Sequence, residues 1–581
     1  MSNDEPDSVP LNSVHVQCIV IGIVGALAAA LGFIGYHQYF KAQGSSGNTA
    51  DAVYQTFLLF MFQFEGELGP KPLPLEIARF AAPVVTSFTV VLAFMRIIGR
   101  RLQLWCLKGH VVLCGLGYKG VFLAKKRLRA GKRVVIIEAD DGNDWIEVCR
   151  SLGAVVLNGD AADEDMLRQA RVTLAGELIA VCEKDTTNIQ IADLARNLAA
   201  GSRPPALAPL RCLVHIVSLK WCASMRSLGA LDVTHAGCTS VSFNFFENCA
   251  RVFLKEQPLD GEWIGPDEPR RIHLVLVEAN DMADALMIQA MRVGHFANGE
   301  RLRITVIDEN AEREKNLFYA QFPAADEVAD IAFVDGLAQD PAVRADLAAW
   351  AADPGFRLVV AVCLREETAA METALTLPVE LHRSSVPVFV RLGEENGIAG
   401  VQECARQKVG IRAFGSIQDG CEMPDELDRL PRALHNVYLA KAKQDGRTPG
   451  QDLAMRDWDD LNSVFKDSNR QQADHIPVKL RAVKCVALPA AEVPGGEAFA
   501  FTDDEVECLA RMEHARWCAE RFLAGWSRGP SDKARLISPS LVPYDQLEEK
   551  IKDYDREAVR NIPKVLWQFA GQGLTRQGVA E

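Results

Sequence analysis

The first of two long uncharged stretches decides the environment in which this chain can fold. Residues 18–40, CIVIGIVGALAAALGFIGYHQYF, contain no Asp, Glu, Lys or Arg. An apolar helix of roughly 20 residues is long enough to cross a bilayer. Acidic rather than basic residues precede the stretch, so a cleaved signal peptide is the weaker interpretation. We therefore predict a transmembrane helix here, after a cytosolic N-terminus over residues 1–17.

A second apolar stretch, residues 80–98, ends in positive charge. Arg96 lies within it, and Arg100, Arg101 and Lys108 follow. Lys and Arg accumulate on the cytoplasmic side of membrane proteins. The second helix is therefore predicted to leave the bilayer on that side. Residues 18–108 then form a transmembrane domain in contact with the lipid bilayer, and the N- and C-termini are both cytoplasmic.

A shorter apolar stretch, residues 52–64, lies between the two predicted spans. It is too short to cross the membrane. It either enters the bilayer as a re-entrant helix surrounded by protein or lies on the outer surface as an amphipathic helix. The order of span, re-entrant helix and span resembles the layout of a two-helix potassium-channel subunit.

The potassium-selective filter of that family, a T-V-G-Y-G-like sequence, is absent. Residues 65–70 read EGELGP in its place. Two interpretations of Glu65 and Glu67 remain open. Repeated around a symmetry axis they would form an acidic ring that attracts cations, whereas in a simple loop they are solvated charges.

A glycine turn follows the membrane region. Gly115, Gly117 and Gly120 have G-x-G-x-x-G spacing after a predicted strand over 110–114. A predicted helix follows, then a second strand over 133–137 that ends at Glu138, where a carboxylate binds ribose hydroxyls. Glycine permits the tight turn, the close approach of phosphate to the backbone and the packing of helix on strand. This pattern predicts a dinucleotide-type fold.

The following segment has the same alternation of strands and helices. A third strand over 154–157 precedes Gly159 and Asp160, and a fourth over 178–182 precedes Asp185 and Asn188. Together with the glycine turn, these residues resemble the RCK (TrkA-N) family over residues 109–255. The resemblance implies binding of NAD(H) or an adenine nucleotide and regulation of an attached pore. The residues expected to contact the nucleotide are Gly115, Leu116, Gly117, Tyr118, Lys119, Gly120, Glu138, Asp160, Asp185 and Asn188.

Residues 270–420 repeat the strand spacing of the first unit without its glycine turn. Glu278-Ala279-Asn280-Asp281 stands in its place, and Asp308 keeps the ribose-type position. Without glycine the backbone cannot easily approach a pyrophosphate, and we interpret Asp308 as the cap of a turn. The segment resembles a second, degenerate RCK unit. Tandem units of this family imply a ring in a homotetramer.

The last segment, residues 431–570, is predicted to be α-helical. Its motifs, among them Glu513-His514-x-Arg516-Trp517, Gly525-Trp526 and Asp555-Arg556, resemble the RyR domain. Two readings remain open. The side chains form either a ligand pocket or a structural cluster in which charges pair and the tryptophans fill the core. The candidate ligand residues are Arg470, His514, Arg516, Trp517 and Trp526.

Composition and motifs restrict the function further. A formal net charge of −14 argues against nucleic acid as a partner. The 15 cysteines are scattered without metal-ligand spacing, and no catalytic constellation is recognisable, so neither a metal site nor an enzyme is expected.

These observations together predict a mixed fold: two transmembrane helices with a re-entrant helix, two α/β Rossmann-like units and one helical RyR-like unit. The family resemblances imply a ligand-gated, cation-channel-like protein of the bacterial inner membrane. A non-conducting membrane sensor or a defence effector are the alternatives.

Overall fold

The computed structural model describes the backbone of residues 13–44, 48–64, 70–229, 231, 234–235, 237–261, 263–393, 410–448, 454–493, 495 and 499–576. It describes the side chains of the same residues, apart from 13–18 and 93–103. Residues 1–108 with 146–156 form one compact unit and the rest of the chain forms another, and each is described by itself.

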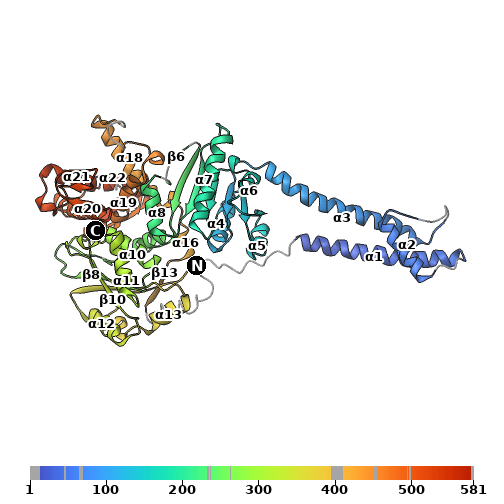
Figure 1. Ribbon diagram of the computed structural model, residues 1–581, viewed down its shortest axis with the longest axis horizontal. Coiled ribbons are helices and arrows are strands. Elements are labelled where there is room, and N and C mark those ends of the chain that lie inside the picture. Colours follow the sequence, from blue (N-terminus) through green and yellow to red (C-terminus); the bar gives the residue numbers. More distant parts are fainter. Residues whose placement is uncertain are drawn as a thin grey trace. The chain divides into compact units, whose positions relative to one another are not determined.

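The N-terminal unit contains α1 (Ser13–Ala42), α2 (Thr49–Phe60) and α3 (Leu73–Trp105) (Figure 1). Two windows, Ile19–Ala42 and Leu73–Leu92, are long and apolar enough to cross a membrane, judged by length and composition. Helices α1 and α3 approach closely at Gly35, because a Cβ atom there would lie 2.5 Å from the backbone nitrogen of Leu75. Small residues permit this kind of contact between apolar helices.

The short helix predicted over residues 52–64 is present as α2 and spans Thr49–Phe60. Asn48 begins it, since its side chain accepts the N–H of Asp51 while the Asp51 carboxylate accepts the N–H of Asn48. Twelve residues span about 18 Å as a helix, which is short of a bilayer core. Its re-entrant placement stays a prediction. Glu65 and Glu67, the candidate pore residues, lie outside the described residues.

The first α/β sheet has the strand order β3-β2-β1-β4-β5-β7-β6. Strand β1 pairs in parallel with β2 and β4, the ladder continues in parallel through β5 to β7, and β6 is antiparallel to β7. The strand order reverses between β1 and β4, and ligands of such sheets bind beyond the carboxyl ends of the strands at that point. The strands are β1 (Val111–Cys114), β2 (Val134–Glu138), β3 (Val155–Asn158), β4 (Glu177–Ala180), β5 (Leu210–His215), β6 (Thr234–His235) and β7 (Cys238–Phe243). The helices are α4 (Tyr118–Arg129), α5 (Trp145–Ser151), α6 (Glu164–Gln169), α7 (Asp185–Ser202), α8 (Leu219–Ser227) and α9 (Phe245–Glu256).

The second sheet repeats this arrangement with the order β10-β9-β8-β11-β12-β13, in which every neighbouring pair is parallel. The predicted second Rossmann-like unit is therefore confirmed. Its strands are β8 (Arg271–Val277), β9 (Arg303–Asp308), β10 (Asp330–Asp335), β11 (Phe356–Val362), β12 (Val388–Arg391) and β13 (Ile411–Phe414). Its helices are α10 (Asp281–Val293), α11 (Ala311–Gln321), α12 (Pro341–Ala352), α13 (Glu367–Thr376), α14 (Val379–Arg383) and α16 (Ile417–Gly420).

The C-terminal unit is mainly helical, as predicted, but it also contains short β-ribbons. Strand β14 pairs antiparallel with β17, so that Cys485 lies opposite Arg576, and β15 pairs with β16. The strands are β14 (Cys485–Pro489), β15 (Ser527–Arg528), β16 (Ile537–Ser538) and β17 (Gln572–Arg576). The helices are α17 (Pro424–Leu427), α18 (Arg429–Gln444), α19 (Ser463–Ala482), α20 (Asp503–Leu523), α21 (Glu549–Arg560), α22 (Ile562–Val565) and the π-helical turn η7 (Leu566–Ala570).

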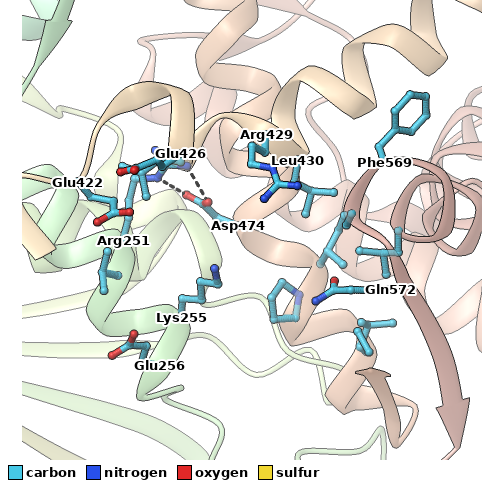
Figure 2. Close-up of a pocket in the computed structure, with 18 of the residues that line it drawn as sticks. Arg251, Lys255, Glu256, Glu422, Glu426, Arg429, Leu430, Asp474, Phe569 and Gln572 are labelled. Atoms are coloured by element: carbon cyan, nitrogen blue, oxygen red, sulfur yellow. Dashed lines mark hydrogen bonds and ion pairs between the residues drawn. The ribbon is translucent and has the colours of Figure 1, made fainter. Parts of the chain in front are cut away.

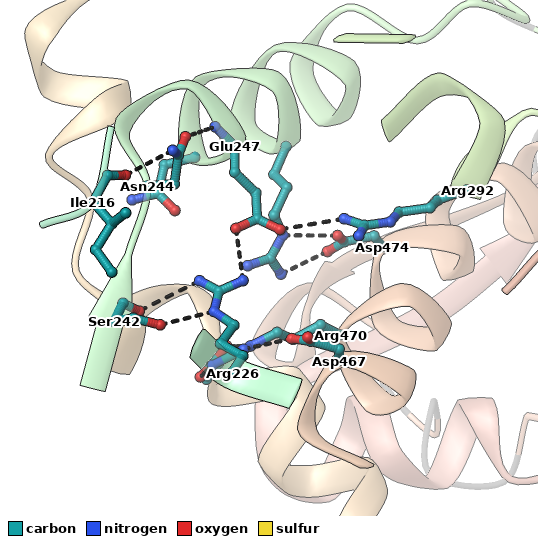
Figure 3. Close-up of polar contacts among 12 residues, drawn as sticks. Ile216, Arg226, Ser242, Asn244, Glu247, Arg292, Asp467, Arg470 and Asp474 are labelled. Atoms are coloured by element: carbon teal, nitrogen blue, oxygen red, sulfur yellow. Dashed lines mark hydrogen bonds and ion pairs between the residues drawn. The ribbon is translucent and has the colours of Figure 1, made fainter. Parts of the chain in front are cut away.

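A chain of ion pairs joins the two α/β units and the C-terminal unit (Figure 3). Glu247 of α9 accepts hydrogen bonds from Arg226 of α8 and Arg292 of α10. Arg251 of α9 binds both carboxylate oxygens of Asp474 on α19. Burial alone would raise the pKa of Glu247, but the two arginines lower it overall. These contacts make α9 a common support for all three segments.

Candidate functional site: a cavity at the glycine turn

Each glycine of the turn has a different physical reason to be glycine. Gly115 has φ +95°, a left-handed conformation that L side chains rarely adopt. A Cβ atom on Gly120 would lie 2.1 Å from the carbonyl oxygen of Gly115, so α4 packs against the turn only without a side chain there. Gly117 is the N-cap residue directly before α4, and a Cβ atom on it would meet nothing within 4 Å. The N-terminus of α4 therefore faces open space, where backbone N–H groups favour an anion.

Glu138 ends β2 beside this turn. Its carboxylate accepts the backbone N–H of Leu116 at 2.5 Å and that of Asp140 at 3.0 Å. These contacts fix the carboxylate at the mouth of the turn and leave acceptor capacity on both oxygens. Asp160 also lines the cavity and accepts the N–H of Ala162. Glu138 and Asp160 both line the cavity, and their contact with ribose hydroxyls stays a prediction.

The turn opens into a cavity of about 950 Å³, which is large enough for a dinucleotide-sized ligand. One wall comes from the first α/β unit and the other from the second. Tyr118 bridges the two, since its hydroxyl lies 3.3 Å from the carbonyl oxygen of Gly393. The principal lining residues are Gly115, Leu116, Gly117, Tyr118, Lys119, Glu138, Asp140, Asn143, Asp160, Lys184, Phe245, Phe246, Arg365, Glu367, Arg391 and Gly415.

Basic side chains from both units enter the cavity, whose lining also contains acidic groups. Lys119 lies 3.2 Å from Nε2 of His215 and 5.0 Å from the ring centroid of Phe245. Burial lowers the pKa of Lys119, and burial together with Lys119 lowers the pKa of His215 to about 3. His215 is therefore neutral and able to accept from Lys119. Arg391 enters from β12 and lies over the ring of Phe246.

Three predicted nucleotide-contact residues, Gly120, Asp185 and Asn188, lie outside this lining. Both carboxylate oxygens of Asp185 accept backbone N–H groups, from Val217 and Ser218. Asn188 is fully buried and bonds to the backbone of Cys182 and His215. The side chains of Asp185 and Asn188 hold the segments that follow β4 and β5 in place and so support the residues that line the cavity.

Sequence reasoning missed the lining residues that come from distant segments. Lys184 lies directly before α7, and Arg365, Arg391 and Gly415 belong to the second unit. The position of Lys184 directly before Asp185 could have identified it as a candidate lining residue from the sequence. The other three carry no local motif, because only the packing of the two units brings them to the glycine turn.

The corresponding turn of the second unit is filled by its own side chains. Glu278 has φ +70° and replaces the first glycine. Asp308 accepts the backbone N–H groups of Ala279 and Asn310, as Glu138 does in the first unit. Asn280 donates to the carbonyl of Cys363 and caps α10. The interpretation of Asp308 as a turn cap fits this geometry.

The C-terminal unit contains a buried charge cluster. Glu513 accepts from Lys479 at 2.6 Å and from two nitrogens of Arg516, which also donates to Glu520. All four side chains are buried. Arg470 is similarly paired, with both carboxylate oxygens of Asp428 and with Asp467. The geometry gives Arg470 and Arg516 internal partners, as expected for a structural cluster.

His514 and Trp526 lie elsewhere, in the lining of a second cavity of about 630 Å³ between the C-terminal unit and the second α/β unit. Trp517 stacks on His514 but is not part of this lining. Burial lowers the pKa of His514, but the hydrogen bond to Asp555 and contacts with Cys518 and Val542 raise it to about 10 overall. The imidazolium is therefore positively charged at neutral pH, and its two ring nitrogens bond to Asp555 and to the carbonyl oxygen of Val542.

The charge of His514 makes the stability of the C-terminal unit depend on pH. Its folded pKa lies above the unfolded value near 6.5, so its contribution is complete below about pH 6.5 and is lost as pH rises toward about 10. We expect a decline in melting temperature over this range that His514→Gln removes. Thermal melts of both proteins from pH 6 to 10 measure it. If the melting temperatures of the two proteins fell in parallel with pH, the decline would not come from the charge of His514.

Comparison with known proteins identifies two segments. Residues 111–230 match the family model of the TrkA-N domain, and residues 501–572 match that of the RyR domain. The chain thus contains a TrkA-N domain, which includes the glycine turn, and a RyR domain, which includes His514 and Arg516. In the described residues no group of His, Cys, Asp and Glu is arranged to hold a metal ion.

Curated relatives match a short part of the chain. The glutathione-regulated potassium-efflux system protein KefC of Enterobacter sp. (strain 638) is 35% identical over 87 residues, 15% of this chain and 14% of the relative. KefC of Salmonella newport (strain SL254) is 31% identical over 88 residues, with the same coverage. The chain thus spans about one seventh of the length of these relatives.

Solved structures match more of the chain at lower identity. The GsuK channel bound to NAD is 13% identical, with a TM-score of 0.37, and the match covers 75% of this chain and 84% of that one. GsuK bound to ADP is 14% identical, with a TM-score of 0.35, and the match covers 71% of this chain and 96% of that one.

Proposed function

We propose that this protein is a nucleotide-gated, cation-channel-like protein of a bacterial inner membrane. The cavity at the glycine turn binds NAD(H) or an adenine nucleotide, and the occupied cavity changes the state of the membrane helices. One observation carries the proposal: the lining of this cavity comes from both α/β units. A ligand there contacts both walls and favours one spacing of the units over another, which is the differential affinity that gating requires.

In this proposal, groups of different charge contact different parts of the nucleotide. The N–H groups at the start of α4, with Lys119, face the phosphates. Glu138 and Asp160 face the ribose hydroxyls. Arg391 completes the phosphate side from the second unit. Homotetrameric assembly, with Glu65 and Glu67 as candidate pore residues, belongs to the same proposal and rests on the resemblance of the membrane segment to two-helix channel subunits.

Reconstituted protein tests this function directly. Full-length protein in liposomes is expected to pass K⁺ at a rate that changes at least about tenfold when ADP or NAD is added on the cytosolic side, a free-energy change of about 1.4 kcal/mol. Potassium release is measured with an ion-selective electrode, and Glu138→Ala should shift the response to higher nucleotide concentration. Equal flux with and without nucleotide would contradict gating.

The absence of a T-V-G-Y-G sequence favours a second candidate function. In this alternative the protein is a non-conducting membrane-bound nucleotide sensor. It binds ADP or NAD with the same residues, but liposomes that contain it release no ions under any nucleotide. The flux assay combined with calorimetry on the same protein separates the two functions, because calorimetry reports nucleotide binding independently of flux.

The RyR domain is proposed to bind a further ligand or partner at the cavity that His514 and Trp526 line. His514 contributes an imidazole already paired with Asp555, and Trp526 contributes a flat apolar surface. Arg470 and Arg516 stabilise the fold of the domain in this proposal, since their guanidinium groups are already paired.

A further inference from the structure

A third cavity, of about 790 Å³, lies away from both sites described above (Figure 2). Its walls come from three parts of the chain: α9 of the first α/β unit, the connection through α16 to α18, and the C-terminal segments α19, β14, η7 and β17. Its size suits a small organic molecule. None of the residues that the sequence singled out lines it.

Most of the charged side chains in its lining already have partners. Arg251 is paired with Asp474, and Arg481 with both carboxylate oxygens of Asp260. Glu422 and Glu426 face Lys126. The two arginines are neutralised by their carboxylates, whereas Glu422 and Glu426 share one lysine.

Two cations remain. Lys255 near the end of α9 and Arg429 at the start of α18 are exposed, and among the described residues neither side chain has a hydrogen bond or an ion pair. Figure 2 shows the two side chains extending toward the space between them. Glu256 is the remaining lining carboxylate without a partner among the described residues. Lys255 and Arg429 are therefore the lining cations that an anionic group can contact directly, although the lining as a whole is not positively charged.

The rest of the surface is apolar. Ile476 and Leu480 of α19 and Leu566 of η7 contribute side chains that are at least nine-tenths buried, and Leu430 and Val486 lie beside them. Phe569, also on η7, keeps 42% of its surface exposed at the rim. A π-helical turn such as η7 is rare and is often found at functional sites. An apolar wall beside unpaired cations suits a ligand with one charged end and one flat apolar part.

We propose that this cavity binds a small organic anion in which a phosphate or carboxylate is attached to an aromatic or other flat apolar body. The anionic group lies between Lys255 and Arg429, and the apolar body lies against Leu430, Ile476 and Leu480. Because Arg251 lines the cavity and also belongs to the ion-pair chain through α9, the ligand contacts the element that supports all three segments. The site is separate from the glycine turn and does not depend on the function proposed there.

Binding of 1-naphthyl phosphate to the full-length protein in detergent micelles tests the proposal by isothermal titration calorimetry. We expect saturable binding that weakens at least about tenfold in Lys255→Ala and in Arg429→Ala and is lost in the double variant. Lys255→Arg keeps the charge and should stay within about threefold of the unmodified protein. Both side chains are exposed, so their removal leaves the fold intact.

Matched controls exclude other binding sites. Lys220→Ala removes an exposed lysine outside the cavity, and Gly117→Val obstructs the glycine turn, so neither should change the affinity for 1-naphthyl phosphate. Absence of saturable binding, or equal affinity in Lys255→Ala and Arg429→Ala, would overturn the proposal. So would loss of binding in Gly117→Val, which would place the probe at the glycine turn. Inorganic phosphate binding as tightly as 1-naphthyl phosphate would overturn the role of the apolar wall.

Discussion

Replacing Gly117 with valine is expected to abolish nucleotide binding while the protein stays folded. A Cβ atom on Gly117 meets no protein atom within 4 Å, and the backbone φ of −70° is open to any residue. The valine methyl groups would occupy the space through which a phosphate approaches the start of α4. Loss of the helix-capping glycine costs up to about 1 kcal/mol of stability. The dissociation constants of ADP and NAD, measured by calorimetry, should rise at least about 100-fold, or about 2.7 kcal/mol.

Two other glycines make this result specific. Gly201 also has open space around it and is not part of the cavity lining, so Gly201→Val should bind nucleotide normally. Gly120→Ala should instead unfold the first α/β unit, because the new Cβ atom meets a backbone oxygen at 2.1 Å. If Gly117→Val bound ADP and NAD as well as the unmodified protein, the phosphates would not lie at the glycine turn.

Removing the charge of Glu513 is expected to destabilise the C-terminal unit by about 3–5 kcal/mol. Glu513→Gln keeps the size of the side chain but leaves Lys479 uncompensated in a buried site and deprives Arg516 of one of its two carboxylates. Urea unfolding followed by tryptophan fluorescence reports the loss, since Trp517 and Trp526 lie in this unit.

The double variant Lys479→Met/Glu513→Gln is the informative control. It removes both members of the buried pair, while Arg516 keeps Glu520, so most of the lost stability should return. Arg511→Ala breaks an exposed pair with Asp545 and should cost less than about 1 kcal/mol. If the double variant were as unstable as Glu513→Gln, the loss would come from packing and not from an unpaired charge.

The same pair also predicts sensitivity to acid. Burial alone would raise the pKa of Glu513, but Arg516 and Lys479 lower it to about 2. A depressed folded pKa gives stability that is present above the unfolded value near 4.5 and is lost as pH falls toward 2. The C-terminal unit should therefore lose stability steeply over this range, and Glu513→Gln should flatten the dependence.

The sequence determined the elements whose cause is local. Apolar length alone predicted the helices that contain Ile19–Ala42 and Leu73–Leu92. Glycine spacing predicted the turn between β1 and α4, because steric limits at Gly115 and Gly120 act between residues close in the chain. The alternation of apolar strands with helices predicted both Rossmann-like units, because this pattern is also set by residues close together in the chain.

Only the tertiary structure decided how these elements combine into sites. Tyr118 meets Gly393 from 275 residues away, so the second wall of the glycine-turn cavity has no local signature. Arg470 was compatible with a ligand or a structural role until folding placed Asp428 against it, 42 residues away in sequence. Lys255 and Arg429 likewise face one cavity only because α9 and α18 both pack against α19. A side chain's chemistry depends on which distant group lies beside it, and that is fixed only when the units pack.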